Sequence, residues 1–237
     1  MRLLDLTLPG AAENLALDEA LLVAAETGTG GAVLRLWELS AFAVVVGSGG
    51  SVGIDVNAAA CEADGVPVLR RASGGGTVVL GPGCLCFSVV LNYDAAPLLN
   101  DIRASNAYVL GRVLRAIQPV LSAGVEGTSD LTTGGAKFSG NAQQRKRTHF
   151  LHHGTLLCGF DLERVSRYLN APEREPEYRR GRAHAEFVRN LPLTVEEAKR
   201  LLVAEWAPAG EYSDPPLELT RELVRDKYSR PEWTHRR

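Results

Sequence analysis

The sequence predicts a mixed α/β fold of the α+β class, in which a mixed and largely antiparallel sheet is flanked by helices. Helical and strand-like patterns intermix without a regular strand-helix repeat, which favours this arrangement over a doubly wound parallel sheet. The chain has 237 residues, of which 45% are hydrophobic, so it can bury a substantial core. No internal repeat or low-complexity tract divides it. We therefore expect a single domain over residues 1–237.

Helices are expected where apolar residues recur at helical spacing or follow capping residues. Residues 14–25 carry leucines at this spacing, and we expect Asp18 and Glu19 to point away from the apolar face. The other expected helices span residues 55–63, 102–121 and 161–169, and a further one follows Thr194, where Glu197 completes the spacing of a capping box.

Strands are expected in short runs rich in β-branched and aromatic residues. Residues 32–39 and 42–47 fit this description, and the second run is apolar enough to be buried on both faces. Residues 66–71 run into three glycines, and after a Gly-Pro-Gly turn the chain returns as another strand, which makes a β-loop-β unit. The segments TSDLTT, GAKFSG and HGTLLCGF are expected to be successive strands of a sheet. Residues 172–184 are polar and rich in proline, and we expect an ordered loop or lid there.

Composition limits the classes of partner and the cellular compartment that we expect for this chain. The chain has 26 Lys and Arg against 28 Asp and Glu, so its net charge of -2 indicates neither a nucleic-acid surface nor an anionic membrane as a partner. The first residues lack the basic and the uninterrupted apolar regions of a signal peptide, and no apolar run approaches the roughly 20 residues that span a bilayer. We expect a cytoplasmic protein. Its four cysteines, with no zinc-ligand spacing, are expected to be reduced thiols.

The segment RRASGGGTV carries the densest chemical signal. Three consecutive glycines have no Cβ, so backbone N–H groups there can close on a carboxylate or phosphate. Arg70 and Arg71 stand directly before them, and a guanidinium offers forked donors to an anion. The segment is neither a dinucleotide fingerprint nor a Walker loop. The alternative is a tight turn between two strands.

Lys137 carries the second signal. It follows two glycines and precedes Phe138-Ser139-Gly140-Asn141 in a strand-like stretch, so it can approach a buried ligand. An ammonium there would neutralise a phosphate or polarise a carbonyl. Taken alone, such a lysine is more often exposed and solvated. His153, in His153-Gly154-Thr155, is either a ligand contact or a hydrogen-bonded histidine of the core.

Four motifs in this order, RRASGGG, SDL, GAKFSGNAQ and HHGTLL, resemble those of the lipoate-protein ligase A family within the biotin/lipoate ligase superfamily. NLALDEALL near the start and KYSRPEW at 227–233 are similar to the first helix and the end of the family's catalytic domain. The resemblance covers nearly the whole chain. It implies the mixed sheet of the biotin/lipoate ligase catalytic domains.

The resemblance also implies a two-step reaction. Lipoate and ATP give an enzyme-bound lipoyl-AMP, and a lysine of a carrier domain then accepts the acyl group. Lys137 is implied as the catalytic contact to the acyl carbonyl and the α-phosphate, where charge accumulates and Mg²⁺ usually assists. Asp130 corresponds to the aspartate of an Asn-Asp motif and is the candidate for orienting Mg²⁺ or a nucleotide group, although Ser129 replaces the asparagine. The residues implied to bind the acyl or adenylate group are Arg70, Arg71, Ser73, Gly74, Gly75, Gly76, Thr77, Ser139, Gly140, Asn141, His153, Gly154 and Thr155.

The chain departs from the family pattern after the glycines. Many ligases have a His-Asp pair followed by Gly-Asn, whereas residues 80–84 read Leu-Gly-Pro-Gly-Cys. Either the nucleotide is held differently or the acyl donor or carrier differs. We also expect the accessory C-terminal domain of the longer ligases to be absent, and a separate small subunit to supply it if ligation needs that domain. The lid arginines Arg179, Arg180 and Arg182 are expected to be solvated rather than to contact ATP or an acidic carrier.

The main alternative is an octanoyltransferase of the same superfamily, which takes its acyl group from acyl carrier protein through a cysteine thioester. No cysteine lies between Cys86 and Cys158, and Glu173 follows Pro172 where one subgroup has Pro-Cys-Gly. Cys84 is expected to be a small apolar residue of a strand rather than a nucleophile. A non-catalytic module that binds lipoyl groups is the alternative from another class, and biotin is a weaker alternative substrate.

Overall fold

Five strands form the central sheet, in the order β1-β2-β6-β11-β10. We analysed a computed structural model, which describes residues 1–172 and 175–237. Within the central sheet β1 and β2 are parallel, and the other neighbours are antiparallel. Its strands are β1 (Arg2–Asp5), β2 (Val33–Trp37), β6 (Cys84–Asn92), β10 (Asn141–Arg145) and β11 (His149–Leu157).

Two three-stranded sheets lie beside the central sheet. One has the order β4-β3-β5, with β3 parallel to β4 and antiparallel to β5, and the other has the antiparallel order β7-β8-β9. Their strands are β3 (Ala43–Val46), β4 (Val68–Arg70), β5 (Val78–Leu80), β7 (Gly124–Glu126), β8 (Asp130–Thr133) and β9 (Ala136–Ser139). The mixed, largely antiparallel architecture predicted from the sequence is confirmed, although it is distributed over three sheets.

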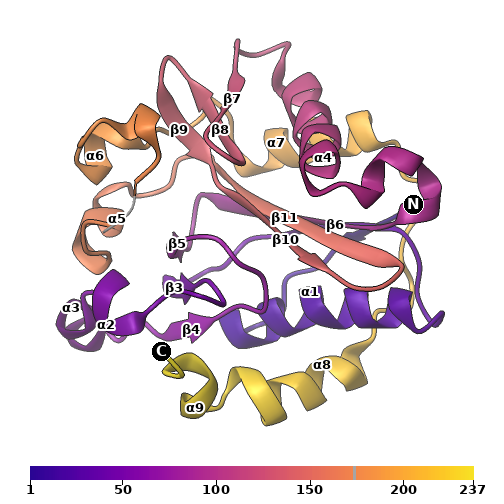
Figure 1. The fold of residues 1–237 in the computed structure, drawn as a ribbon, viewed down its shortest axis with the longest axis horizontal. Helices are drawn as coiled ribbons and strands as arrows, with labels where there is room; N and C mark the ends of the chain where they lie inside the picture. The colour runs from indigo at the N-terminus through magenta and orange to yellow at the C-terminus, as the bar shows by residue number, and fades with distance from the viewer. Residues whose placement is uncertain (173–174) are drawn as a thin grey trace.

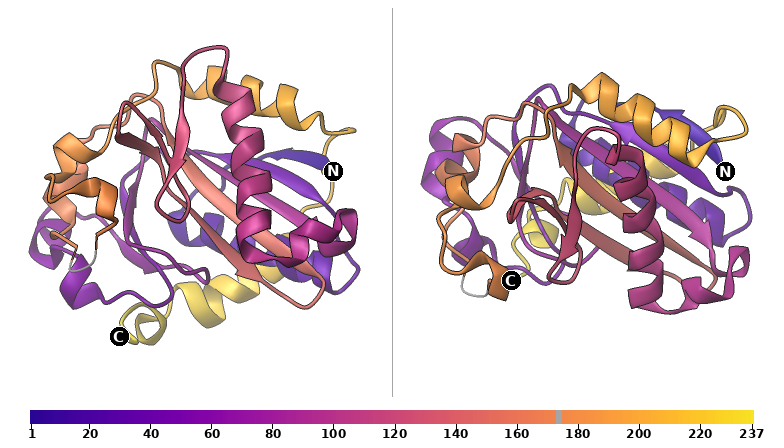
Figure 2. Two further views of the ribbon diagram at one scale, coloured as in Figure 1. Left: turned by 45° about the horizontal axis from the view of Figure 1, so that its top comes forward. Right: turned by 90° about the horizontal axis from the view of Figure 1, so that it is seen from above.

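Helices cover both faces of the central sheet (Figures 1 and 2). Helices α4 (Ile102–Ile117) and α7 (Val195–Trp206) lie on one face, and α1 (Ala11–Glu26) with α8 (Leu217–Leu223) lies on the other. The shorter helices are α2 (Val52–Asp55), α3 (Ala58–Ala63), α5 (Glu163–Tyr168), α6 (His184–Phe187) and α9 (Pro231–Thr234); 3₁₀ turns occur at Tyr93–Ala95, Pro97–Asn100 and Glu177–Arg179, and a π turn occurs at Val224–Tyr228. No helix within the described ranges is long and apolar enough to cross a membrane.

Strand β6 is the centre of the core because helices cover it on both sides. Its side chains alternate between faces, as strand geometry requires. Leu85, Phe87 and Val89 join the core on the side of α4 and α7. Cys86 and Val90 join the clusters on the opposite face. Eight of its nine residues are buried, so the strand holds any site at its edge rigidly.

The expected first helix is confirmed, but the expectation that its acidic residues turn away from the core is wrong. Asp18 is 2% and Glu19 7% exposed, because α1 lies between the central sheet and the C-terminal helices. Asp18 pairs with the fully buried Arg35 at 2.6 Å. Glu19 accepts hydrogen bonds from Lys227 and Tyr228.

Several boundaries also differ. The expected helix at 55–63 is two short helices, because the Asn57 side chain caps α3 by accepting from the Ala60 N–H. The helix expected to reach residue 121 ends at Ile117. Strand β10 was missed, because its sequence NAQQR lacks apolar alternation. The capping box at Thr194 is present as predicted.

Candidate active site

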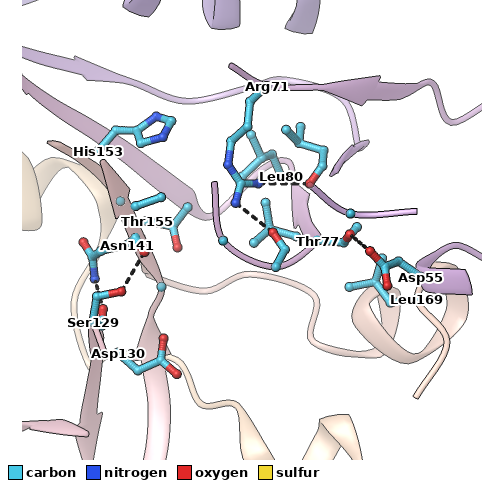
Figure 3. Close-up of a pocket in the computed structure, with 18 of the residues that line it drawn as sticks. Asp55, Arg71, Thr77, Leu80, Ser129, Asp130, Asn141, His153, Thr155 and Leu169 are labelled. Atoms are coloured by element: carbon cyan, nitrogen blue, oxygen red, sulfur yellow. Dashed lines mark hydrogen bonds between the residues drawn. The ribbon is translucent and has the colours of Figure 1, made fainter. Parts of the chain in front are cut away.

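A cavity of about 720 Å³ lies between three walls. The first is the segment 72–77, here called the glycine loop, and the second comprises the ends of β8 to β11. The third is residues 175–187, here called the lid. In Figure 3, Arg71 and Thr77 lie on one side of the cavity, and Asp130, Asn141 and His153 lie on the other. The cavity therefore gathers most of the motifs that the sequence singled out.

Arg71 braces the glycine loop from within. Its Nη2 donates to the carbonyl oxygens of Gly74 at 2.6 Å and Gly76 at 2.8 Å. Its Nη1 donates to the Val45 carbonyl at 3.2 Å, and its Nε donates to Ser73 Oγ at 3.0 Å. Burial lowers the pKa of Arg71 to about 10, so the guanidinium remains charged at neutral pH. A buried cation thus fixes the direction in which the loop carbonyls point.

The same brace turns backbone N–H groups of the loop outward. The C=O and N–H of one trans peptide unit point in opposite directions, so the N–H groups of Gly75 and Thr77 point away from Arg71. Among the residues that the structure describes, neither N–H has a hydrogen-bond acceptor. The loop conformation depends on glycine at two positions. Gly75 has a φ of +86°, and a Cβ on Gly47 would lie 2.0 Å from the Gly75 carbonyl oxygen. The loop therefore offers free backbone donors, which suit an anionic oxygen.

Lys137 reaches the cavity from β9. Its Nζ lies 2.7 Å from Asp130 Oδ1, and Tyr178 of the lid donates to Asp130 Oδ2 at 2.6 Å. Burial, with the hydrogen bond to Asp130, raises the pKa of Tyr178, so its hydroxyl stays protonated. A Cβ on Gly140 would lie 3.0 Å from Lys137 Nζ, so glycine at position 140 leaves room for the lysine side chain. Lys137 is a cation directed at the cavity and paired with one carboxylate.

Asn141, the first residue of β10, is joined to Ser129, which directly precedes β8, at the wall of the cavity (Figure 3). Its side chain donates to the Ser129 carbonyl, and Ser129 Oγ donates to the Asn141 carbonyl, both at 2.8 Å. A Cβ on Gly154 would lie 1.9 Å from Asn141 Oδ1. Glycine at 154 is therefore required for Asn141 to lie against β11.

His153 links the glycine loop to α1. Ser73 Oγ lies 2.6 Å from Nε2, and Nδ1 lies 3.5 Å from Asp18 Oδ2. A protonated Nδ1 facing the carboxylate leaves Nε2 to accept from Ser73. Although burial raises the pKa of Asp18, Arg35 and the hydrogen bonds from His153 and Ser88 hold it below its ordinary range. Both nitrogens of His153 therefore have partners.

The lid contributes buried polar groups. Arg179 is 6% exposed, lines the cavity and lies over the Phe187 ring, so the expectation that it is solvated is wrong. Arg180 is exposed as expected. His184 also lines the cavity, and its Nε2 lies 3.2 Å from the Asn170 carbonyl oxygen.

One part of the cavity lining is apolar and is drawn from a single core cluster, which suits a hydrocarbon chain. Of the cysteines in the described part of the chain, Cys86 lines the cavity. Burial raises the pKa of its thiol well above the ordinary range. A thiol that stays protonated is a poor nucleophile. The apolar side chains of this part are Leu15, Trp37, Val45, Val78, Leu80 and Leu169, together with Cys86.

Most of the predicted site residues lie together at the cavity. Those that line it are Arg71, Gly75, Gly76, Thr77, Asp130, Lys137, Gly140, Asn141, His153, Gly154 and Thr155.

Arg70 is not among them. It is fully buried, and its guanidinium donates to the carbonyl oxygens of Thr234, Gly47 and Gly50. Its side chain points to the opposite side of β4 from that of Arg71, because adjacent side chains of a strand alternate. The structure therefore corrects its expected place at the ligand channel: Arg70 ties the start of the glycine loop to α9.

Ser73, Gly74 and Ser139 also lie outside the lining of the cavity. Ser73 is 2% and Ser139 1% exposed, and both make hydrogen bonds to side chains behind the wall. Ser73 and Ser139 are thus placed behind the wall rather than in it, whereas Gly74 is exposed on the glycine loop. Sequence reasoning missed Asp18, Asp55 and His184 as lining residues: Asp18 was taken for a solvated residue of its helix, and no motif marks Asp55 or His184. Asp55 Oδ2 accepts a hydrogen bond from the Thr77 hydroxyl at 2.7 Å.

No group of three or more His, Cys, Asp or Glu in the described part of the chain could hold a metal ion by itself. Mg²⁺ is commonly held by one or two carboxylates together with substrate phosphates. Asp130, whose side chain is 17% exposed beside the cavity, fits that kind of site. Glu173, which stands where one subgroup has a cysteine, lies outside the described residues.

The model of the lipoyl protein ligase A/B catalytic domain matches residues 10–207. Lipoate-protein ligase 1 of Staphylococcus aureus is 28% identical over 82% of this chain and 61% of its own length. Octanoyltransferase LipM of Carboxydothermus hydrogenoformans is 28% identical over 95% of this chain and 94% of its own. A bipartite lipoate protein ligase of Thermoplasma acidophilum, solved in a study with its E2 lipoyl domain, has a TM-score of 0.84 at 25% identity and covers 99% of this chain and 95% of its own. The chain spans 45% to 61% of the length of four curated sequence relatives named as lipoate-protein ligases.

Proposed function

The chain belongs to the lipoyl protein ligase A/B catalytic domain family, and from this membership we propose that it is an ATP-dependent lipoate-protein ligase. It would join lipoate or octanoate to AMP and then transfer the acyl group to a lysine of a carrier domain. The observation that carries this proposal is the cavity that combines an apolar end, the Lys137 ammonium and the outward N–H groups of the glycine loop.

Each part suits one portion of an acyl-adenylate. The apolar end accommodates the hydrocarbon chain, and the N–H groups of Gly75 and Thr77 donate to a carboxylate or phosphate oxygen. Lys137 stabilises the negative charge that accumulates when the carboxylate attacks the α-phosphorus. Mg²⁺ would be held by Asp130 with the nucleotide phosphates, where it supplies further neutralisation of charge.

The environment of Cys86 favours this chemistry over a thioester. An acyl-cysteine mechanism needs a thiolate, and burial keeps the Cys86 thiol protonated. The octanoyltransferase remains the second candidate because of the likeness to LipM, which extends over almost the whole of both chains.

The acceptor that we propose is a lipoyl carrier domain. A separate accessory subunit is proposed as well, by analogy with the bipartite ligase of Thermoplasma acidophilum. An acceptor assay with and without added accessory subunits tests both proposals.

One incubation separates the candidate functions. The protein, with and without the proposed accessory subunit, is mixed with ATP, Mg²⁺ and lipoate, and in parallel with octanoyl-acyl carrier protein. A lipoyl-AMP product supports the ligase. An octanoyl thioester on the protein supports the transferase and refutes the ligase. If neither product forms, both enzymes are refuted and a binding module is favoured.

A further inference from the structure

His184 is a titratable side chain of the cavity to which the chemistry above gives no task. It is the first residue of α6, half-buried in the lid, and its Nε2 lies 3.2 Å from the Asn170 carbonyl oxygen. A carbonyl oxygen can only accept, so Nε2 carries the proton and Nδ1 carries a lone pair. Among the described residues no donor hydrogen-bonds to Nδ1, so this lone pair is available.

The backbone fixes His184 relative to Lys137. The Val188 N–H donates to the His184 carbonyl at 3.0 Å, and Val188 forms a β-bridge with Lys137. The Arg189 N–H donates to the Lys137 carbonyl at 2.8 Å. Helix α6 is thereby joined to β9, and the side chains of His184 and Lys137 both line the cavity. His184 therefore lines the same cavity as Lys137, which would polarise the acyl carbonyl there.

We propose that His184 is the general base of the acyl-transfer step, and that its Nδ1 takes a proton from the acceptor lysine. This inference rests on the function proposed above. A lysine amine with an ordinary pKa of about 10.4 is mostly ammonium at neutral pH and attacks only after it loses a proton to solvent. The neutral nitrogen then bonds to the acyl carbon, and the bond from that carbon to the adenylate oxygen breaks. AMP leaves with the electron pair, and the surplus proton on nitrogen passes to His184 Nδ1 and on to solvent.

The other bases of the cavity are occupied. Asp130 has one oxygen against Lys137 and the other bonded to Tyr178, and the proposed function assigns its remaining lone pairs to Mg²⁺. The lone pair of His153 accepts from Ser73.

Asp18 and Asp55 are the remaining carboxylates of the lining. Asp18 is held by Arg35 and Ser88, and Asp55 accepts the Thr77 hydroxyl. A carboxylate is also a weaker base than imidazole near neutral pH, where general-base catalysis works best with a matched group.

The surroundings keep the imidazole of His184 neutral, as a base requires. Burial lowers its pKa, and the cations Arg179 from the lid and Lys137 from β9 act in the same direction. The hydrogen bond to the Asn170 carbonyl acts in the opposite direction and is outweighed.

The test separates the two half-reactions. Enzyme carrying preformed acyl-adenylate is mixed with a lipoyl carrier domain, and single-turnover transfer is followed across pH. In His184→Gln the amide can still donate to the Asn170 carbonyl, but no group accepts the proton. We expect transfer to slow about 100-fold. The pH profile should also lose the step that titration of His184 adds to the acidic limb, while the dependence due to the acceptor lysine remains. Added imidazole should partly restore His184→Ala. Glu186→Gln, an exposed change on the same helix, is the matched control and should transfer at the normal rate.

Three results would overturn the inference. Transfer by His184→Gln at the normal rate would exclude the base. An equal loss of adenylate formation and transfer, with no rescue by imidazole, would make His184 a structural residue of the lid. If the unaltered protein forms no acyl-adenylate, the proposed function itself is refuted and the inference falls with it.

Discussion

Arg71 is expected to stabilise the glycine loop rather than to bind the anion directly. Arg71→Met removes every donor of the guanidinium and leaves the carbonyl oxygens of Val45, Gly74 and Gly76 without their charged partner. An unsatisfied buried group costs about 1–3 kcal/mol. Val45 is fully buried, whereas the two glycines are exposed and can be rehydrated, so we expect a loss of about 2–4 kcal/mol in total.

For a chain of this length such a loss lowers Tm by about 5–15 °C, which a thermal unfolding scan resolves. Binding of ATP, measured by calorimetry, should weaken in parallel, since the N–H groups of the loop lose their fixed direction. Arg225→Met is the control, because its side chain is 67% exposed and pairs with the adjacent Asp226. An unchanged Tm combined with lost ATP binding would refute the brace and make Arg71 a direct ligand contact.

Three further changes test the surrounding walls. Gly154→Ala places a Cβ against Asn141 Oδ1, and we expect about 1–3 kcal/mol of destabilisation in a urea titration; unchanged stability would show that Asn141 moves freely. Gly140→Ala should displace the Lys137 ammonium and slow adenylate formation more than it lowers Tm, a split that equal losses would contradict. Burial lowers the pKa of His152 to about 3, so the unfolded chain binds one more proton between that value and 6.5, and stability falls as pH drops through this window. His152→Gln should flatten that dependence by up to about 1.4 kcal/mol per pH unit in unfolding titrations, and an unaltered slope would mean that His152 is not the responsible group.

Local sequence predicted the motifs better than the direction of their side chains. The glycine loop, Lys137 and the His153 segment were found from residue type and spacing, and the structure brings them to one cavity. Arg70 and Arg71 are adjacent and chemically identical, so residue type alone does not distinguish their roles. Strand alternation turns one toward α9 and the other into the loop.

Residues that depend on distant partners were not predictable. Asp18 looked like a solvated residue of an amphipathic helix, because nothing near it in the sequence shows that it pairs with Arg35 in the folded chain. His184 and Arg179 lie in a polar, proline-rich segment where solvated charge is the ordinary expectation. Their burial follows from the contact of α6 with β9, which only the tertiary fold supplies.

The most direct test of the proposed ligase is lipoate-dependent exchange of labelled pyrophosphate into ATP, measured on the unaltered protein and on Lys137→Ala, each with and without the proposed accessory subunit. Reversible formation of lipoyl-AMP predicts exchange that requires both lipoate and Mg²⁺. Removal of the ammonium should reduce it by about 100-fold or more. The fold should persist, since the Lys137 side chain is 25% exposed and Tyr178 still donates to Asp130. Absence of exchange in the unaltered protein, or full exchange in Lys137→Ala, would contradict the account.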